Sequence, residues 1–159
     1  MKWKELLENW GMTSLKLKAG FLETEWKPTD PDKDAAWDLY VELLTRIATQ
    51  PLANEAGIEK TALDSIYSIF PTTRSILKSK GRQCVEFTKL AIIVLNQIIR
   101  PFTAKWHRIS TEDAFLKPET CKQFRKELEA LQHQLITYAK ALADIADVED
   151  MTDLNHIED

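Results

Sequence analysis

The chain has 159 residues and a net charge of −4 at neutral pH, and its composition is 44% hydrophobic and 29% charged. A chain of this size buries about two-thirds of its surface on folding, enough for one self-sufficient core. Its 4 glycines and 6 prolines exclude collagen-like, low-complexity and wholly disordered proteins, and its 2 cysteines exclude a disulfide framework.

The N-terminal thirty residues predict a short helix followed by a change of period. Trp3 and Trp10 lie with two leucines on one face of a helix over residues 2–10. Between residues 14 and 26, apolar and charged residues alternate on either side of Ala19-Gly20. This pattern predicts either a small β-hairpin or an irregular or helical arm, and the sequence leaves both open.

Apolar periodicity predicts one all-α domain over residues 1–146, an antiparallel bundle of four to six helices. The core helices are expected near residues 31–50, 57–70, 83–106 and 118–146, with a shorter helix ending near Gly81.

Prolines mark the expected helix boundaries. Asp30 is expected to cap the first core helix, with Pro31 at its first position. Pro51 and Pro71 are expected to end the first two core helices. Pro101 lies inside an apolar pattern, so we expect the third core helix to kink or break there.

The last core helix carries the most regular pattern in the chain. Its apolar residues, spaced alternately by three and four, run from Cys121 to Ile145 as a heptad seam. The seam either packs on the chain's own helices or pairs with another chain. In the second case Leu128, Leu135 and Leu142 form an interface.

The five tryptophans divide into two groups. Trp3, Trp10 and Trp37 lie on apolar stripes, so we expect them in the core. Trp26 and Trp106 lie at element ends beside charged residues, where amphipathic rings are enriched at interfaces. Trp26 is therefore a candidate interface residue.

Motifs for metal, nucleotide or covalent chemistry are missing from the sequence. It contains no Glu-x-x-His, HExxH or CxxC spacing, no glycine-rich phosphate loop and no nucleophile elbow. We therefore expect no enzyme activity, no cofactor and no metal. The alternative is a base at His107, because its neighbours Lys105 and Arg108 lower the pKa of an imidazole.

Charge is unevenly distributed along the chain. Residues 71–108 hold eight basic residues and one acidic residue, net +7, whereas residues 144–159 hold seven acidic residues and no Lys or Arg. The basic middle predicts a site for an anionic ligand or a partner. The candidate residues of this site are Arg74, Lys78, Arg82, Arg100, Lys105, Trp106, His107 and Arg108.

The acidic end loses helical period after residue 146. We expect residues 147–159 to form a flexible tail, and we hypothesise that this tail folds back on the basic middle and screens it.

These patterns favour a non-enzymatic helical protein–protein interaction module, a small subunit or adaptor of a larger assembly, or a homo-oligomer. The alternative is a module that binds nucleic acid or a nucleotide through the basic region. The longest apolar run, Leu90–Ile99, is too short and too polar to span a bilayer. With no signal-like segment and two isolated cysteines, we expect a cytoplasmic protein that does not enter a membrane.

Overall fold

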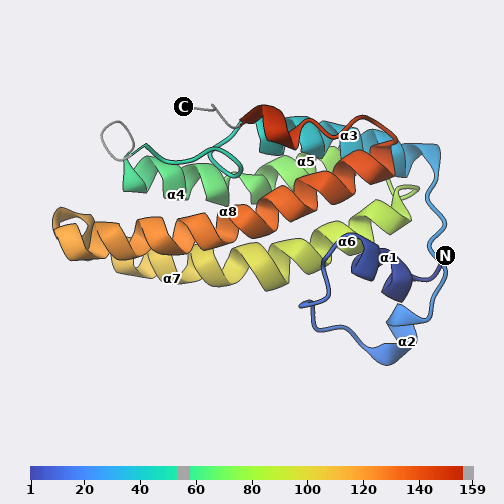
Figure 1. Cartoon of the computed structure of the whole chain (residues 1–159), viewed down its shortest axis with the longest axis horizontal. Coiled ribbons are helices and arrows are strands. Elements are labelled where there is room, and N and C mark those ends of the chain that lie inside the picture. The colour runs from blue at the N-terminus through green and yellow to red at the C-terminus, as the bar shows by residue number, and fades with distance from the viewer. Residues whose placement is uncertain (54–57, 156–159) are drawn as a thin grey trace.

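The computed structural model describes residues 1–53 and 58–155, which form an all-α bundle (Figure 1). Its elements are α1 (Trp3–Asn9), α2 (Ala19–Leu22), α3 (Asp30–Leu44), α4 (Glu59–Tyr67), α5 (Ile69–Lys80), α6 (Val85–Val94), the π-helical turn η1 (Leu95–Ile99), α7 (Arg100–Ser110), the 3₁₀ turn η2 (Ala114–Leu116), α8 (Pro118–Ala146) and the 3₁₀ turn η3 (Thr152–Asn155). The predicted fold class is confirmed.

The long helix α8 is the centre of the bundle. The helices α3, α6 and α7 run opposite to α8, while α4 and α5 run in the same direction (Figure 1). The apolar seam of α8 packs chiefly against α3, with further contacts to α4, α7, η1 and η2. Its buried residues are Phe124, Leu128, Leu131, Leu135, Tyr138, Leu142 and Ile145. The heptad seam therefore packs on the chain's own helices, as in a bundle, and α8 does not project from the molecule.

Pro101 is accommodated by a π-turn and not by a break. Proline has no N–H to donate to the preceding turn. In η1 the backbone widens, and the Arg100 N–H donates to the carbonyl of Leu95, five residues back. Beyond it α7 continues to Ser110. The predicted interruption of the helix at Pro101 is therefore present as a π-turn, and the helix continues beyond it instead of breaking.

Two other proline boundaries are displaced from the predicted positions. The helix α3 ends at Leu44, before Pro51, and the Thr49 hydroxyl donates to the Leu43 carbonyl at 2.9 Å. The break after α4 lies at Ser68, and Pro71 falls in the first turn of α5. A first-turn proline removes no helical hydrogen bond, because the N–H groups there have no acceptor within the helix.

The start of α3 also connects two helices. The cap is Thr29, one residue before the expected Asp30, and its backbone N–H donates to the Asp32 carboxylate at 2.8 Å. The other oxygen of Asp32 accepts the backbone N–H of Phe87 in α6, also at 2.8 Å. One buried carboxylate therefore satisfies donors at the first turns of α3 and α6.

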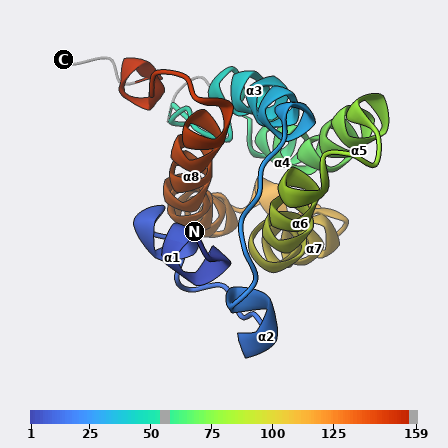
Figure 2. The same ribbon diagram turned by 90° about the vertical axis from the view of Figure 1, so that its right-hand side faces the viewer.

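The N-terminal arm contains no β-hairpin. This arm, residues 1–29, consists of α1, the single turn α2 and irregular segments, with one isolated β-bridge between Lys2 and Glu25. Glu23, which the hairpin would place opposite Lys16, instead pairs with the Lys2 ammonium at 2.8 Å. The arm lies against α6 and α8 at one end of the bundle (Figures 1 and 2).

The core extends past the predicted domain boundary at residue 146. Asp147 takes a left-handed conformation that ends α8 and reverses the chain. Val148 and Met151 then pack on the core, and Thr152 is buried. The backbone N–H of Met151 donates to the Tyr40 hydroxyl of α3 at 2.7 Å. As far as Asn155, the segment expected to be a free tail is placed against the bundle; the predicted tail's last residues, 156–159, lie outside the described residues.

Candidate functional site

The six cationic residues of the predicted basic site are distributed over two helices and a turn. Arg74 and Lys78 are exposed on α5, Arg82 follows α5, and Arg100, Lys105 and Arg108 are exposed on α7. Two of the six have partners. The Arg100 guanidinium lies over the Phe70 ring at 4.8 Å, and Lys105 pairs with Glu127 at 2.6 Å.

Trp106 does not lie at the surface. Its side chain is 1% exposed and stacks on Phe115, with the edge of Phe124 against it. A nucleic-acid base therefore has no access to this ring, and we correct the expectation that Trp106 contributes to a surface site.

His107 lies in the contact between α4 and α7. Its ring meets the edge of Tyr67, and its Nε2 is 4.0 Å from an Asp64 oxygen that also binds Lys60. Partial burial, reinforced by the Lys60 charge, lowers the pKa of His107, while Asp64 acts in the opposite direction. In the described part of the chain no hydroxyl or thiol hydrogen-bonds to this ring, so the geometry offers no activated nucleophile.

The four predicted interface residues pack against other residues of the same chain. Leu128, Leu135 and Leu142 are buried in the core. Trp26 is half-buried and makes edge contacts with Trp3 and Trp10, at centroid distances of 4.9 and 5.6 Å. None of the four presents an open apolar face.

A groove between the N-terminal arm and α6 combines exposed apolar side chains with positive charge. We call it the lysine groove. Its volume is about 370 Å³, and its lining residues are Lys16, Leu17, Lys18, Phe21, Lys89, Ile92 and Ile93. Ile92 is 51% exposed, although it lies on α6, a helix rich in apolar residues. The lining includes three lysines and no acidic residue.

One wall of the lysine groove is held by a glutamine of the π-turn. The backbone N–H of Lys16 donates to Gln97 Oε1 at 2.8 Å, and Gln97 Nε2 donates to the Lys16 carbonyl at 2.9 Å. This reciprocal pair fixes the extended segment beside α6. The π-turn therefore has a second consequence, because it lies at the position from which Gln97 reaches the arm.

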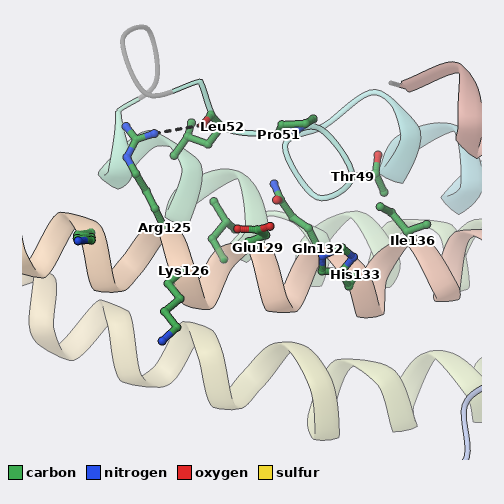
Figure 3. A pocket seen from close by; sticks show the side chains of 11 residues that line it. Thr49, Pro51, Leu52, Arg125, Lys126, Glu129, Gln132, His133 and Ile136 are labelled. Atoms are coloured by element: carbon green, nitrogen blue, oxygen red, sulfur yellow. Dashed lines mark hydrogen bonds between the residues drawn. The ribbon is translucent and has the colours of Figure 1, made fainter. Parts of the chain in front are cut away.

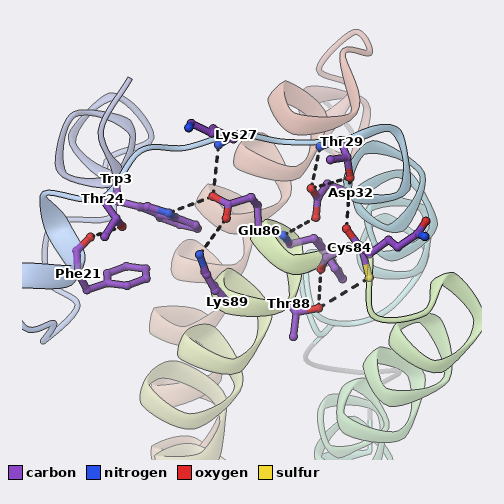
Figure 4. Close-up of polar contacts among 12 residues, drawn as sticks. Trp3, Phe21, Thr24, Lys27, Thr29, Asp32, Cys84, Glu86, Thr88 and Lys89 are labelled. Carbon is purple, nitrogen blue, oxygen red and sulfur yellow. Dashed lines mark hydrogen bonds and ion pairs between the residues drawn. The ribbon is translucent and has the colours of Figure 1, made fainter.

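The arm is also held by the buried carboxylate of Glu86, which is 7% exposed (Figure 4). Glu86 accepts the Trp3 indole N–H at 3.2 Å and the Lys27 backbone N–H at 3.4 Å. Its other oxygen pairs with Lys89 at 2.9 Å. Trp3 in turn packs on Phe21, with 5.0 Å between the ring centroids. This network therefore positions two residues of the groove lining, Phe21 and Lys89.

A larger groove, of about 580 Å³, lies between residues 49–52 and α8 (Figure 3). Two of its polar side chains bind the loop backbone. Gln132 donates to the carbonyls of Ile47 and Gln50, and Arg125 donates to the carbonyls of Leu52 and Ala53. Arg125 also pairs with Glu59 at 2.9 Å. These contacts dock the connection after α3 onto α8 and indicate a structural role.

The ion pair with Arg125 affects the pKa of the Glu59 carboxyl group. Burial alone would raise the pKa of Glu59, but hydrogen bonds from its own backbone N–H and from Arg125 outweigh burial and lower the pKa.

A second exposed apolar face lies on α3. Trp37 is 42% exposed and Val41 is 40% exposed, one helical turn apart. The expectation that Trp37 belongs to the core is therefore wrong. Asp34 and Asp38 are on the same helix, and Asp38 pairs with Lys80 at 3.2 Å. This face is acidic, in contrast to the lysine groove.

The acidic residues after α8 lie near α3 and do not cover the basic helices. Within residues 147–155 no acidic side chain forms an ion pair with a base, and the segment is held through Tyr40. The described part of the tail therefore does not screen the basic middle.

Within residues 1–53 and 58–155, no cluster of three or more His, Cys, Asp or Glu side chains is arranged to hold a metal ion. Over the same residues, no helix combines the length and apolarity needed to cross a membrane. No protein-family model matches the chain, and comparisons with curated proteins and with solved structures find no match either.

Proposed function

We propose that this protein is a non-enzymatic, cytoplasmic protein–protein interaction module that acts as a small subunit or adaptor of a larger assembly. The observation that supports this proposal is the exposure of Ile92 in the lysine groove, beside Leu17 and Phe21. Apolar surface bordered by charge is typical of protein-binding sites. Leu17 and Phe21 pack on the core, whereas Ile92 does not belong to the core cluster and is left exposed.

A tagged pull-down from host lysate tests the proposal, run with and without nuclease and with co-purifying proteins identified by mass. The informative variant is Ile92→Asp, which places a charge in the groove at a solvent-exposed position. Its matched control is Leu116→Asp, because Leu116 is 82% exposed in η2, away from the groove.

We expect one stoichiometric protein that survives nuclease, is lost with Ile92→Asp and is kept with Leu116→Asp. A wild-type chain that captures no protein would remove the proposal. Self-association is measured in the same preparation by sedimentation at several concentrations, because a homo-oligomer dissociates on dilution.

The alternative function is binding of nucleic acid or a nucleotide. The observation that favours it is the exposure of Arg74, Lys78, Arg82 and Arg108, which have no recorded hydrogen bond or ion pair in the described part of the chain. Binding through several phosphates falls steeply with salt. An affinity for single-stranded oligonucleotide that stays flat from low to physiological salt, or that survives Arg74→Glu with Lys78→Glu, would exclude it.

A further inference from the structure

We propose that the lysine groove binds an acidic amphipathic helix of a partner protein, whose apolar face packs on Ile92 and whose flanking carboxylates pair with the lysines. This inference rests on the proposed function and specifies the chemistry of the partner. Four properties of the groove carry it: its floor, its charge, its rigidity and its place on the molecule.

The floor of the groove is suited to aliphatic side chains. Leu17, Ile92 and Ile93 line it together with the single ring of Phe21. The groove is open to solvent and has a volume of about 370 Å³. A partner helix that presents apolar residues three and four positions apart would lay its apolar stripe along this floor.

The charge of the groove selects an acidic partner. Lys16 and Lys18 are exposed and have no recorded side-chain partner in the described part of the chain. Lys89 pairs with Glu86, but that carboxylate is buried and already shared with Trp3 and the Lys27 backbone. The rim therefore presents uncompensated positive charge on the arm side of the floor, from Lys16 and Lys18, whereas Glu86 neutralises Lys89 on the α6 side. Charges at a rim steer association and reject like-charged partners.

The groove is built in advance of binding. The Gln97 pair holds the segment of Lys16, and Glu86 holds Trp3, on which Phe21 packs. A wall fixed in this way loses little conformational entropy when a partner binds. Gln97 is thus a positioning residue, since it contacts the wall and does not line the groove.

The acidic face of α3 and the acidic segment after α8 lie away from the groove, and the acids that follow α2, Glu23 and Glu25, pair with the Lys2 ammonium and the N-terminal ammonium. The helix α3 and the segment after α8 are on one side of the bundle, whereas α2 is on the other (Figure 2). The chain therefore does not cover its own lysine groove with its own acids over the described residues, and the site is left for a second molecule.

A membrane or a nucleic acid fits these features less well than a helix. Each lysine near an anionic bilayer contributes about 1 kcal/mol, and stable anchoring requires a second signal, whereas three lysines line a hollow in a net acidic protein. Single-stranded nucleic acid binds on stacked aromatic rings, and the floor offers one partly buried ring.

Site-specific photo-cross-linking in the full chain tests this inference in host cells. A benzophenone amino acid replaces Ile92 in one sample and Leu116 in a control sample, and the cross-linked peptides are sequenced by mass spectrometry. We expect the Ile92 probe, and not the Leu116 probe, to label one acidic segment with apolar residues at helical spacing. A neutral or basic segment, a lipid, a nucleic acid or no product at Ile92 would overturn the inference.

A binding measurement with the identified segment, synthesised as a peptide, gives the second readout. Lys16→Glu with Lys18→Glu is expected to weaken binding at least tenfold, and Gln97→Ala to weaken it several-fold although it does not line the groove. Lys122→Glu with Lys126→Glu, at exposed positions on α8, is the matched charge control and should change affinity little. Equal losses in both double variants would contradict a specific groove.

The two proposals fail separately. A partner that the pull-down captures and that Ile92→Asp does not release would leave the interaction module intact and remove the groove as its docking site. Phosphatidylserine vesicles that sediment the wild-type chain, and fail to do so with Lys16→Glu and Lys18→Glu, would replace the partner helix with a membrane.

Discussion

The indole N–H of Trp3 donates to the buried carboxylate of Glu86 at 3.2 Å, and this contact joins two residues that are 83 positions apart. It connects the N-terminal arm to α6. The same carboxylate accepts a backbone N–H from Lys27 and pairs with Lys89. A single side chain therefore holds both ends of the arm and one lysine of the groove.

Replacing Glu86 with Ala should release the arm. The change leaves the Trp3 and Lys27 N–H groups without their acceptor in a buried site, and we expect the free energy of unfolding to fall by about 2–4 kcal/mol. Urea unfolding measures this loss, and amide exchange of residues 2–27 should accelerate. Glu86→Gln keeps an acceptor oxygen and should cost less. Unchanged exchange in the arm would contradict this role.

Leu135→Ala should lower the free energy of unfolding of the bundle, as expected for a core residue that packs within one chain. Leu135 is fully buried in the α8 seam, and such truncations cost about 2–5 kcal/mol. The control is Glu129→Ala, an exposed position on the same helix, which should change stability by less than about 0.5 kcal/mol. The loss should be the same at low and high protein concentration. A concentration-dependent loss would instead place the seam between chains.

Tyr40→Phe should loosen the segment after α8. The hydroxyl of Tyr40 accepts the Met151 N–H at 2.7 Å, and its removal should cost about 1 kcal/mol. Amide exchange of residues 148–152 reports the release directly. Tyr67→Phe is the matched control, since Tyr67 is a half-exposed tyrosine on α4. Equal exchange in the two variants would show that other contacts hold the segment.

His107 should make stability depend on pH in a defined direction. The folded environment lowers the pKa of His107 below its ordinary value of 6.5, chiefly through burial and then through Lys60, against the opposing effect of Asp64. As pH falls, the unfolded chain takes up this proton first. The contribution is therefore present above about pH 6.5 and is lost as pH falls through the folded pKa.

Urea unfolding at about pH 7.5 and about pH 5.5 measures this effect. The wild type should lose more stability between the two conditions than His107→Gln, because carboxylates common to both chains contribute equally. Parallel losses in the two proteins would contradict the pKa direction.

The helical class and most core positions followed from local pattern. The seam from Cys121 to Ile145 predicted α8 almost to the residue, and the helix expected near residues 83–106 is present as α6, η1 and α7. The errors arose at prolines, because a proline can end a helix, lie in its first turn or follow a π-turn. Pro71 was expected to end a helix and Pro101 to kink or break one, but Pro71 lies in a first turn and Pro101 follows a π-turn. A first-turn proline removes no helical hydrogen bond, and before Pro101 the Arg100 N–H donates to the carbonyl five residues back.

The candidate site was less accessible to sequence reasoning. The basic middle pointed to α5 and α7, where Arg100 and Lys105 have partners and Trp106 is buried. Lys16 and Lys18 lie in the segment that the sequence left open as a hairpin or an irregular or helical arm, and Lys89 is one of the eight basic residues of the basic middle. The sequence signal that could have located the groove is the width of the apolar stripe on α6. Ile92 and Ile93 make this stripe wider than one buried helix face requires.

The sequence by itself determined which segments are helical and which residues can be buried, because helical period and proline position act over a few residues. Only the tertiary structure decided what covers each face. Trp37 and Ile92 lie on apolar stripes yet remain exposed, whereas Trp106 lies among charges yet is buried. Burial depends on the neighbour that a face meets, and that neighbour is set by contacts such as Trp3 with Glu86 and Lys16 with Gln97, which join segments far apart in the chain.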